Sequence, residues 1–259
     1  VHPSEFGAQS AKIFFDSTRL SVLRIFELVL TGIRSSKNNG NLDRLASLLE
    51  QAKLNYTIES SCKECPDFQY IDYIASKLTD SYDCVIALGG GSVIDCAKGA
   101  SLQSANYAFN RNLSSFSDIK KYVDSKCKVV AIPTTIGTGS ESNGTFIIND
   151  VDKSQRIDFF HLSVRPIIAW LDPNHIQTLE TISIENGLVD VISHLLEQYF
   201  SDEDELFWSD YQIIALLKYC IKCYNEIYKW NDSIKLRNEV QIISFISMSY
   251  LFSQGKRLN

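Results

Sequence analysis

Uninterrupted apolar runs alternate with amphipathic segments through the first two thirds of the chain. The runs at 84–88 and 128–133 are almost free of polar residues, whereas 42–53 and 70–80 repeat apolar residues at helical spacing. Similar short apolar runs occur at 12–16, 55–60, 145–150 and 166–172. Strands that are covered by helices on both faces carry such continuous runs. The pattern therefore predicts an α/β domain built around a mostly parallel, Rossmann-like sheet.

Residues 18–35 have a different pattern, in which charged residues interrupt an apolar run. Arg19, Arg24 and Glu27 recur at helical spacing within "RLSVLRIFELVLTGI". A membrane-spanning helix needs about 20 uninterrupted apolar residues, and this stretch does not provide them. We therefore expect one long amphipathic helix around residues 18 to 35 rather than a membrane helix.

Helical periodicity dominates after the sequence "LDP" at 171–173. Strongly helical stretches follow at 182–200, 205–230 and 236–254, and short polar loops separate them. We therefore expect two domains, an α/β domain over residues 1–173 and an all-α domain over residues 174–259.

Charge and composition exclude some functional classes. The net charge is −6, with 25 Lys and Arg against 31 Asp and Glu, and no basic cluster stands out. Nucleic-acid binding needs a basic surface and is therefore disfavoured. The start of the chain lacks the cationic and then apolar build of a secretory signal. We therefore expect a cytoplasmic protein that has no membrane partner.

The seven cysteines include two pairs with the spacing of metal ligands, Cys62 with Cys65 and Cys220 with Cys223. The second pair lies inside a strongly helical stretch, whereas zinc-binding pairs usually occupy tight turns. The odd number of cysteines also argues against a disulfide framework. We therefore expect reduced thiols rather than a shared zinc site.

The stretch "VIALGGGSVIDCAKGA" places three glycines between an apolar strand and a helical pattern. A helix N-terminus offers main-chain amides and a positive dipole end to phosphate oxygens, and glycine lets a phosphate approach the backbone. Gly89, Gly90, Gly91 and Ser92 would form this cradle. A tight turn between strand and helix could demand the same glycines, and the sequence matches neither G-x-G-x-x-G nor a P-loop.

Two acidic positions suggest further chemistry. Asp16 ends the apolar run at 12–16, where an acid can bind the ribose hydroxyls of NAD and repel the 2′-phosphate of NADP; capping of a following helix is the alternative. Asp190 and His194 are four residues apart, so both project from one helix face. They are either two ligands for Zn²⁺ or Fe²⁺ or an ordinary polar pair. Because Val, Ile and Leu surround them, we expect a partly buried pair that needs partners.

Together these motifs resemble the iron-containing (group III) alcohol dehydrogenase family. "GGGSVIDCAK" is similar to the family's GGGSxxDxAK signature, "IPTTIGTGSESNG" to its threonine-rich loop, and "NGLVDVISHLLEQY" to its D-x-x-x-H metal helix. The "GSESN" and "NGLVD" wording is closest to its butanol-dehydrogenase-like aldehyde reductases. The resemblance extends from about Lys12 to the chain end, and it implies a dehydroquinate-synthase-like α/β domain followed by an all-α domain.

The resemblance implies that a pyridine dinucleotide lies in the cleft between the two domains. NAD is the expected cofactor, and NADP is the alternative. Arg156 aligns with a basic position near the nicotinamide, which is Lys in the family; an Arg there changes the donor geometry. The residues implied in cofactor binding are Asp16, Gly89, Gly90, Gly91, Ser92, Asp95, Thr134, Thr135, Thr138 and Arg156.

The resemblance also implies a catalytic divalent metal, Fe²⁺ or Zn²⁺, of which Asp190 and His194 match two of four ligands. The metal would polarise the oxygen of a small alcohol or aldehyde as a Lewis acid, and hydride would pass between the substrate and the nicotinamide. The expected partner is therefore a small alcohol or aldehyde substrate. The resemblance leaves the assembly state open, and a homodimer is one option.

The sequence departs from the family at the remaining metal ligands, which are histidines on later helices. His2, His161 and His175 all precede the metal helix, and we expect them at surface or loop positions. The family's first pair of strands should also precede the apolar run at 12–16, and the sequence before that run is too short to contain them. We therefore expect that the chain is either part of a longer polypeptide or a shortened homologue with half a metal site. Three hypotheses follow: an NAD(P)-dependent alcohol dehydrogenase or aldehyde reductase, a non-catalytic nucleotide-binding or scaffold subunit, and a dehydroquinate-synthase-like enzyme.

Overall fold

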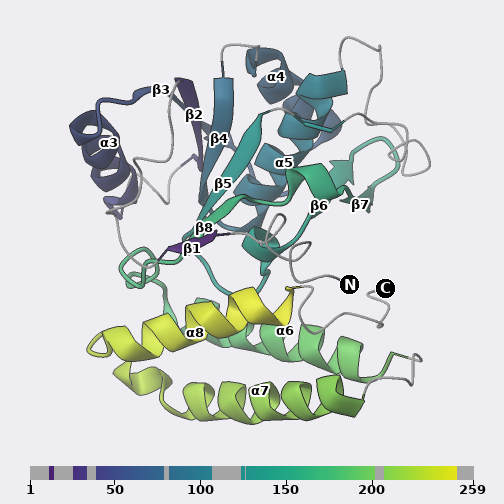
Figure 1. Cartoon of the computed structure of the whole chain (residues 1–259). Coiled ribbons are helices and arrows are strands. Elements are labelled where there is room, and N and C mark those ends of the chain that lie inside the picture. The colour runs from purple at the N-terminus through teal and green to yellow at the C-terminus, as the bar shows by residue number, and fades with distance from the viewer. Residues whose placement is uncertain are drawn as a thin grey trace, which may run out of the picture.

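A six-stranded sheet forms the centre of the first part of the chain in the computed structural model (Figure 1). Its strands pair in the order β1-β8-β5-β4-β2-β3, and every pairing is parallel. The strands are β1 (Lys12–Phe14), β2 (Phe26–Gly32), β3 (Asn55–Cys62), β4 (Tyr82–Gly89), β5 (Lys128–Pro133) and β8 (Ile168–Trp170). The structure describes residues 12–14, 26–33, 39–78, 82–106, 124–125, 127–201 and 207–249. The expected mostly parallel sheet is confirmed.

Strand β2 corrects the prediction of a long amphipathic helix around residues 18 to 35 where the structure describes this range; residues 18–25 and 34–35 lie outside the described residues. Phe26–Gly32 pairs with β3 on one side and with β4 on the other. Leu28 and Leu30 belong to the apolar core on one face of the sheet, and Val29 belongs to the core on the opposite face. The charged residue that suggested helical spacing, Glu27, is 1% exposed, and burial raises its pKa to about 7. The buried Glu27 therefore gave this strand a sequence pattern that resembles the polar face of an amphipathic helix.

Helices cover both faces of the sheet, as the continuous apolar runs predict. Helix α3 (Asn41–Gln51) contributes Leu42, Leu45 and Leu49 to the core on the face that carries Val29. Helices α4 (Phe68–Lys77) and α5 (Gly91–Asn106) pack together in the core that contains Leu28 and Leu30. The Asp67 carboxylate accepts a 2.7 Å hydrogen bond from the Tyr70 amide and so caps α4.

A separate antiparallel hairpin lies against α5. It consists of β6 (Thr145–Asp150) and β7 (Gln155–Phe160), and Phe146 of β6 stacks on Phe159 of β7 with ring centroids 5.4 Å apart. The strand expected at 145–150 is confirmed, but it does not join the parallel sheet. Strand β7 was not predicted, because "QRIDFF" begins with polar residues and shows no clean alternation. Two single-turn helices, η4 (Ser140–Ser142) and η5 (Leu162–Val164), flank the hairpin.

Three helices follow the sheet and share an apolar core of their own (Figure 1). They are α6 (Thr181–Tyr199), α7 (Phe207–Asn225) and α8 (Ile234–Ser247), with the turn η6 (Ile227–Lys229) between the last two. These confirm the three predicted helical stretches, although α7 ends at Asn225 and α8 at Ser247, before the predicted limits. Within the described part, no helix has the length and apolar content to cross a membrane. The division into domains after residue 173 stays a prediction.

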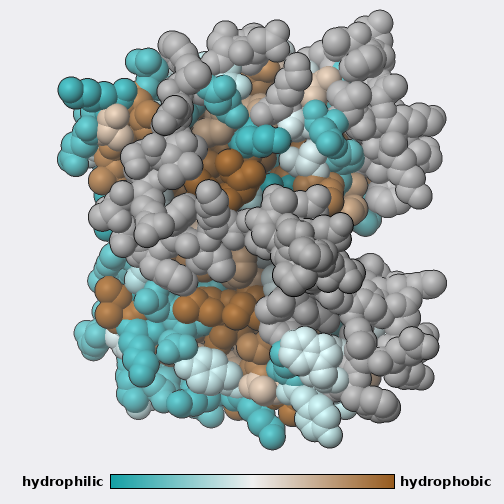
Figure 2. Space-filling view, viewed as in Figure 1, coloured by the Kyte–Doolittle hydropathy of each residue, from teal (hydrophilic) through white to brown (hydrophobic). Residues whose placement is uncertain are grey.

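Exposed apolar and aromatic side chains are prominent on the helical part. Figure 2 shows brown and pale patches between hydrophilic side chains over its surface. The three most exposed large hydrophobic side chains of the described residues, Phe200, Tyr211 and Tyr228, all belong to it.

Arg237 of α8 links the helical part to the end of the sheet. The residue is buried, and its Nε donates to the Pro173 carbonyl at 3.0 Å. Its Nη1 donates to the carbonyls of Trp230 and Asn231. The guanidinium therefore fastens three separate main-chain positions at the junction between the two parts.

His175 lies in the turn at 173–178 beside this junction, so its expected loop position is confirmed, but the residue is buried there. It is 3% exposed, and its ring meets the edge of Trp170 at a centroid distance of 5.4 Å. His161 does lie in a loop, where its Nδ1 accepts from the Ser163 amide, and His2 lies outside the described residues. Burial lowers the pKa of His175 to about 4 from its ordinary 6.5.

We expect the His175→Phe variant to lose less stability in acid than the wild type. As the pH falls from 6.5 toward 4, the unfolded chain protonates this histidine while the folded chain keeps it neutral. Acid then favours unfolding, by at most roughly 2–3 kcal/mol from this residue. Urea unfolding at several pH values measures the effect, and His161→Phe serves as the partly exposed control. Parallel stability curves for His175→Phe and wild type would contradict this role.

Candidate functional site

The glycine turn joins β4 to α5 and packs tightly against the threonine loop that follows β5. A Cβ atom added to Gly90 would lie 3.0 Å from Thr135 Oγ1, and one added to Gly91 would lie 2.9 Å from Thr138 Cγ2. The Thr134 amide donates to the Gly89 carbonyl at 3.0 Å. Close packing between the turn and the loop therefore demands glycine here. The first turn of α5 also faces a cavity, so a role in anion binding is compatible with this packing.

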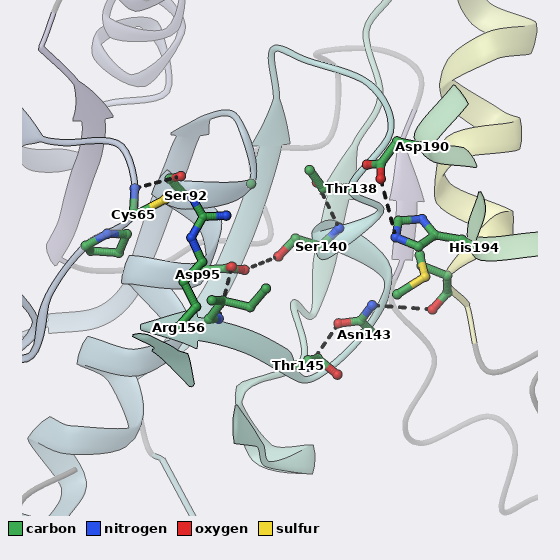
Figure 3. A pocket seen from close by; sticks show the side chains of 14 residues that line it. Cys65, Ser92, Asp95, Thr138, Ser140, Asn143, Thr145, Arg156, Asp190 and His194 are labelled. Atoms are coloured by element: carbon green, nitrogen blue, oxygen red, sulfur yellow. Dashed lines mark hydrogen bonds and ion pairs between the residues drawn. The ribbon is translucent and has the colours of Figure 1, made fainter. Parts of the chain in front are cut away.

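The cavity has a volume of about 360 Å³ and lies between the first turn of α5, the hairpin and α6 (Figure 3). Figure 3 shows Ser92 and Arg156 on one side, and Asp190 and His194 on the other. The predicted site residues that line it are Gly91, Ser92, Asp95, Thr138, Arg156, Asp190 and His194. The structure thus brings predicted cofactor residues and the predicted metal pair into one cavity.

Four of the predicted residues that the structure describes do not line this cavity. Gly89, Gly90, Thr134 and Thr135 lie behind it, in the turn and the loop just described. Asp16 lies outside the described residues, so its assignment to the ribose stays a prediction.

Asp190 and His194 project from the same face of α6, as their spacing predicts. Asp190 Oδ1 lies 3.7 Å from His194 Nε2, and the side chains are 45% and 21% exposed. His194 Nδ1 is buried and has no hydrogen-bond partner among the described residues. A carboxylate and an imidazole are a donor pair that Zn²⁺ and Fe²⁺ accept, so these residues fit a metal. The described residues contain no cluster of three or more His, Cys, Asp or Glu ligands.

Gly137 holds the loop against this pair. Its φ of 111° is one that side-chain-bearing residues rarely adopt, and an added Cβ would lie 2.9 Å from Asp190 Oδ2 and 3.0 Å from the Gly187 Cα. The Gly137 amide donates to Ser244 Oγ at 2.9 Å. The loop therefore touches the glycine turn on one side and Asp190 on the other.

Asp95 is held by protein groups on both carboxylate oxygens. Oδ1 accepts from Ser140 Oγ at 2.6 Å, and Oδ2 accepts from the Ile147 amide at 3.1 Å. Burial raises the pKa of Asp95, although Lys98 and these hydrogen bonds oppose the shift. Through these two hydrogen bonds, Asp95 connects α5 to the loop and to β6. The cofactor contact implied for Asp95 stays a prediction.

Half of the lining residues were not predicted from the sequence. They are Cys65, Pro66, Ser140, Asn143, Thr145, Ile147 and Met248. Ser140 and Asn143 belong to the polar end of the same "IGTGSESNG" loop, so the loop's composition was an available signal. Met248 gives no such signal, because only the packing of α8 brings it to the cavity.

The two cysteine pairs lie in different cores. Cys62 belongs to a core of the sheet, and the Cys65 amide donates to Ser92 Oγ at 3.2 Å. Cys220 and Cys223 are buried in the core of the helical part. A zinc ion shared between the pairs therefore has no structural support.

The fold and cavity define a class: proteins in which a glycine turn of a parallel α/β sheet faces a carboxylate–imidazole pair on a following helix. A model of the family described as iron-containing alcohol dehydrogenase matches residues 20–173. The chain belongs to this family.

Known relatives agree with this assignment. NADH-dependent butanol dehydrogenases B and A of Clostridium acetobutylicum are 27% and 26% identical over 96% and 95% of the chain. The crystal structure of an iron-containing alcohol dehydrogenase from Thermotoga maritima superposes with a TM-score of 0.82, at 27% identity, over 96% of this chain and 69% of that one. The chain spans only 65% and 64% of the two butanol dehydrogenases.

Proposed function

We propose that this chain carries the cofactor cradle and half of the metal site of an NAD(P)-dependent alcohol dehydrogenase or aldehyde reductase. The observation that carries the proposal is the single cavity that holds Gly91, Ser92 and Arg156 opposite Asp190 and His194. Its substrate would be a small alcohol or aldehyde, and it would act in the cytoplasm. The names of the butanol dehydrogenase relatives support NADH as the cofactor.

The residues on the α5 side would bind and orient the dinucleotide. The amides at the N-terminus of this 16-residue helix favour a diphosphate, and the Arg156 guanidinium lies on the same side of the cavity. Arg156 can donate to two phosphate or ribose oxygens at once, which a lysine cannot do with the same geometry. Thr138 packs on Gly91 and so fixes the wall along which the cofactor would lie.

Asp190 and His194 would hold the metal, with further ligands from outside the described residues. When bound, a divalent metal polarises a substrate oxygen as a Lewis acid. Asp190 would supply a carboxylate oxygen and His194 an imidazole nitrogen, and α6 fixes their separation. The chain's own contribution is thus to place the oxygen-binding position across the cavity from the cofactor residues.

Titration of the protein with NADH tests the proposal directly. We expect a fluorescence change that saturates with NADH, and oxidation of NADH by butanal that requires added Fe²⁺ or Zn²⁺. Turnover without bound metal would contradict the role of Asp190 and His194. Saturable NADH binding without metal uptake or turnover would favour the alternative, a non-catalytic nucleotide-binding subunit. No NADH binding would overturn both.

A further inference from the structure

Lys98 is a fully buried lysine that does not line the cavity. It lies on α5 two turns beyond the glycine turn, and its exposure is 0%. Its Nζ donates to Ser140 Oγ and to the Thr145 carbonyl, each at 2.7 Å, and contacts Asn143 Oδ1 at 3.5 Å. The Asp95 carboxylate lies 4.0 Å away. All three acceptors belong to the segment 140–145, whose residues form one wall of the cavity.

The segment held by Lys98 also reaches the helical part. Asn143 Nδ2 donates to the Met248 carbonyl at 3.4 Å, beyond the end of α8. Ser140, which accepts from Lys98, donates in turn to Asp95. The Lys98 ammonium group therefore bonds the wall to α5, while Asn143 of the wall is bonded to Met248 after α8.

Burying this ammonium is unfavourable, which argues for a specific role. Desolvation lowers the pKa of Lys98 to about 8, although Asp95 and the buried Glu141 oppose the shift. An apolar residue of similar volume often stabilises a protein as well as a buried ion pair or better. The benefit of Lys98 is therefore geometric, because a methionine cannot hold three acceptors in place.

We propose that Lys98 is a positioning residue that fixes the 140–145 wall of the cavity and thereby sets the affinity for the dinucleotide. Lys98 itself touches no ligand. It acts through Ser140, whose amide donates to Thr138 Oγ1 at 3.4 Å and whose hydroxyl donates to Asp95, while Thr138 packs on Gly91. The inference rests on the proposed function, because the affinity that it concerns is that for NADH.

The Lys98→Met variant tests this role in the purified full-length protein. We expect the KM for NADH to rise about tenfold while kcat changes less than about twofold, because misplacement of binding groups weakens binding without removing a reacting group. Lys218→Met, which replaces an exposed lysine of α7, should leave both constants unchanged. An unchanged KM in folded Lys98→Met would overturn the proposal.

Ser140→Ala is the second variant, in case Lys98→Met does not fold. It removes the hydroxyl between Lys98 and Asp95 and leaves the lysine in place. We expect a smaller rise in KM, about threefold; no rise would overturn the proposal.

Hydrogen exchange separates failure of this inference from failure of the proposed function. Amides of the wall, such as those of Ser142 and Thr145, should exchange faster in Lys98→Met or Ser140→Ala than in wild type, whether or not NADH binds. If wild type does not bind NADH, the proposed function fails and the role of Lys98 in dinucleotide affinity fails with it. Faster exchange would then leave only a structural role for Lys98. Unchanged exchange in a protein that binds NADH would overturn the positioning role alone.

Discussion

Replacing either Asp190 or His194 with alanine is expected to abolish turnover and to leave NADH affinity within about twofold of wild type. Each side chain offers one of the two donors of the proposed metal site, and both donors line the cavity. Loss of one donor from a metal site lowers the affinity for the metal. Loss of a Lewis acid costs several kcal/mol of transition-state stabilisation, or about 1,000-fold in kcat. Steady-state assays with saturating metal, together with NADH titrations, measure the two effects separately.

A carboxylate elsewhere on the same helix provides the matched control. Glu197 is an exposed residue of α6, so Glu197→Ala should keep wild-type turnover and metal content. If Asp190→Ala or His194→Ala instead retains wild-type turnover, these residues do not hold the catalytic metal. A parallel loss of NADH affinity would mean that the α6 residues contact the cofactor rather than act through the metal.

The Gly137→Ala variant is expected to lose both stability and activity. A methyl group at this position meets Asp190 Oδ2 and the Gly187 backbone, on a main chain whose φ is 111°. Backbone strain and overpacking together should cost about 3 kcal/mol or more of unfolding free energy. Displacement of Asp190 should lower turnover by about 100-fold, since misplacement by about 1 Å can have that effect. Chemical denaturation and steady-state assays measure the two losses.

Gly40→Ala separates the strain of the backbone from the contact with Asp190. Gly40 also has a positive φ, 73°, but an added Cβ would have no neighbour within 4 Å. We expect a stability loss of about 1–2 kcal/mol from the left-handed conformation and no change in turnover. Equal effects of the two substitutions on turnover would show that the contact with Asp190 is unimportant.

The sequence predicted the elements whose pattern of apolar and polar residues follows directly from their burial, such as fully buried strands and amphipathic helices. The buried strands at 84–88 and 128–133 and the helices of the last third lie within or close to the predicted limits. The prediction was wrong at Phe26–Gly32, because the buried Glu27 gave an apolar strand the spacing of an amphipathic helix. It was incomplete at Gln155–Phe160, where hairpin pairing rather than alternation determines the strand.

The site was predictable where a local motif carries the chemistry. The glycine turn and the Asp190–His194 spacing each lie within a few residues of sequence, and the structure places both at the cavity. The residues that connect them were not predictable in the same way. Lys98 meets Ser140 and Thr145 across more than 40 residues of chain, and Met248 reaches the cavity only through the packing of α8.

The three bonds of Arg237 bear on how this chain can change during evolution. Its acceptors are main-chain carbonyls, and every amino acid at positions 173 and 231 would present one. The side chains at these two positions can therefore be substituted without loss of the hydrogen bonds from Arg237. Arg237 itself has no equivalent substitute, because lysine lacks the planar guanidinium group. Among homologues, the donor should be retained while its partners vary.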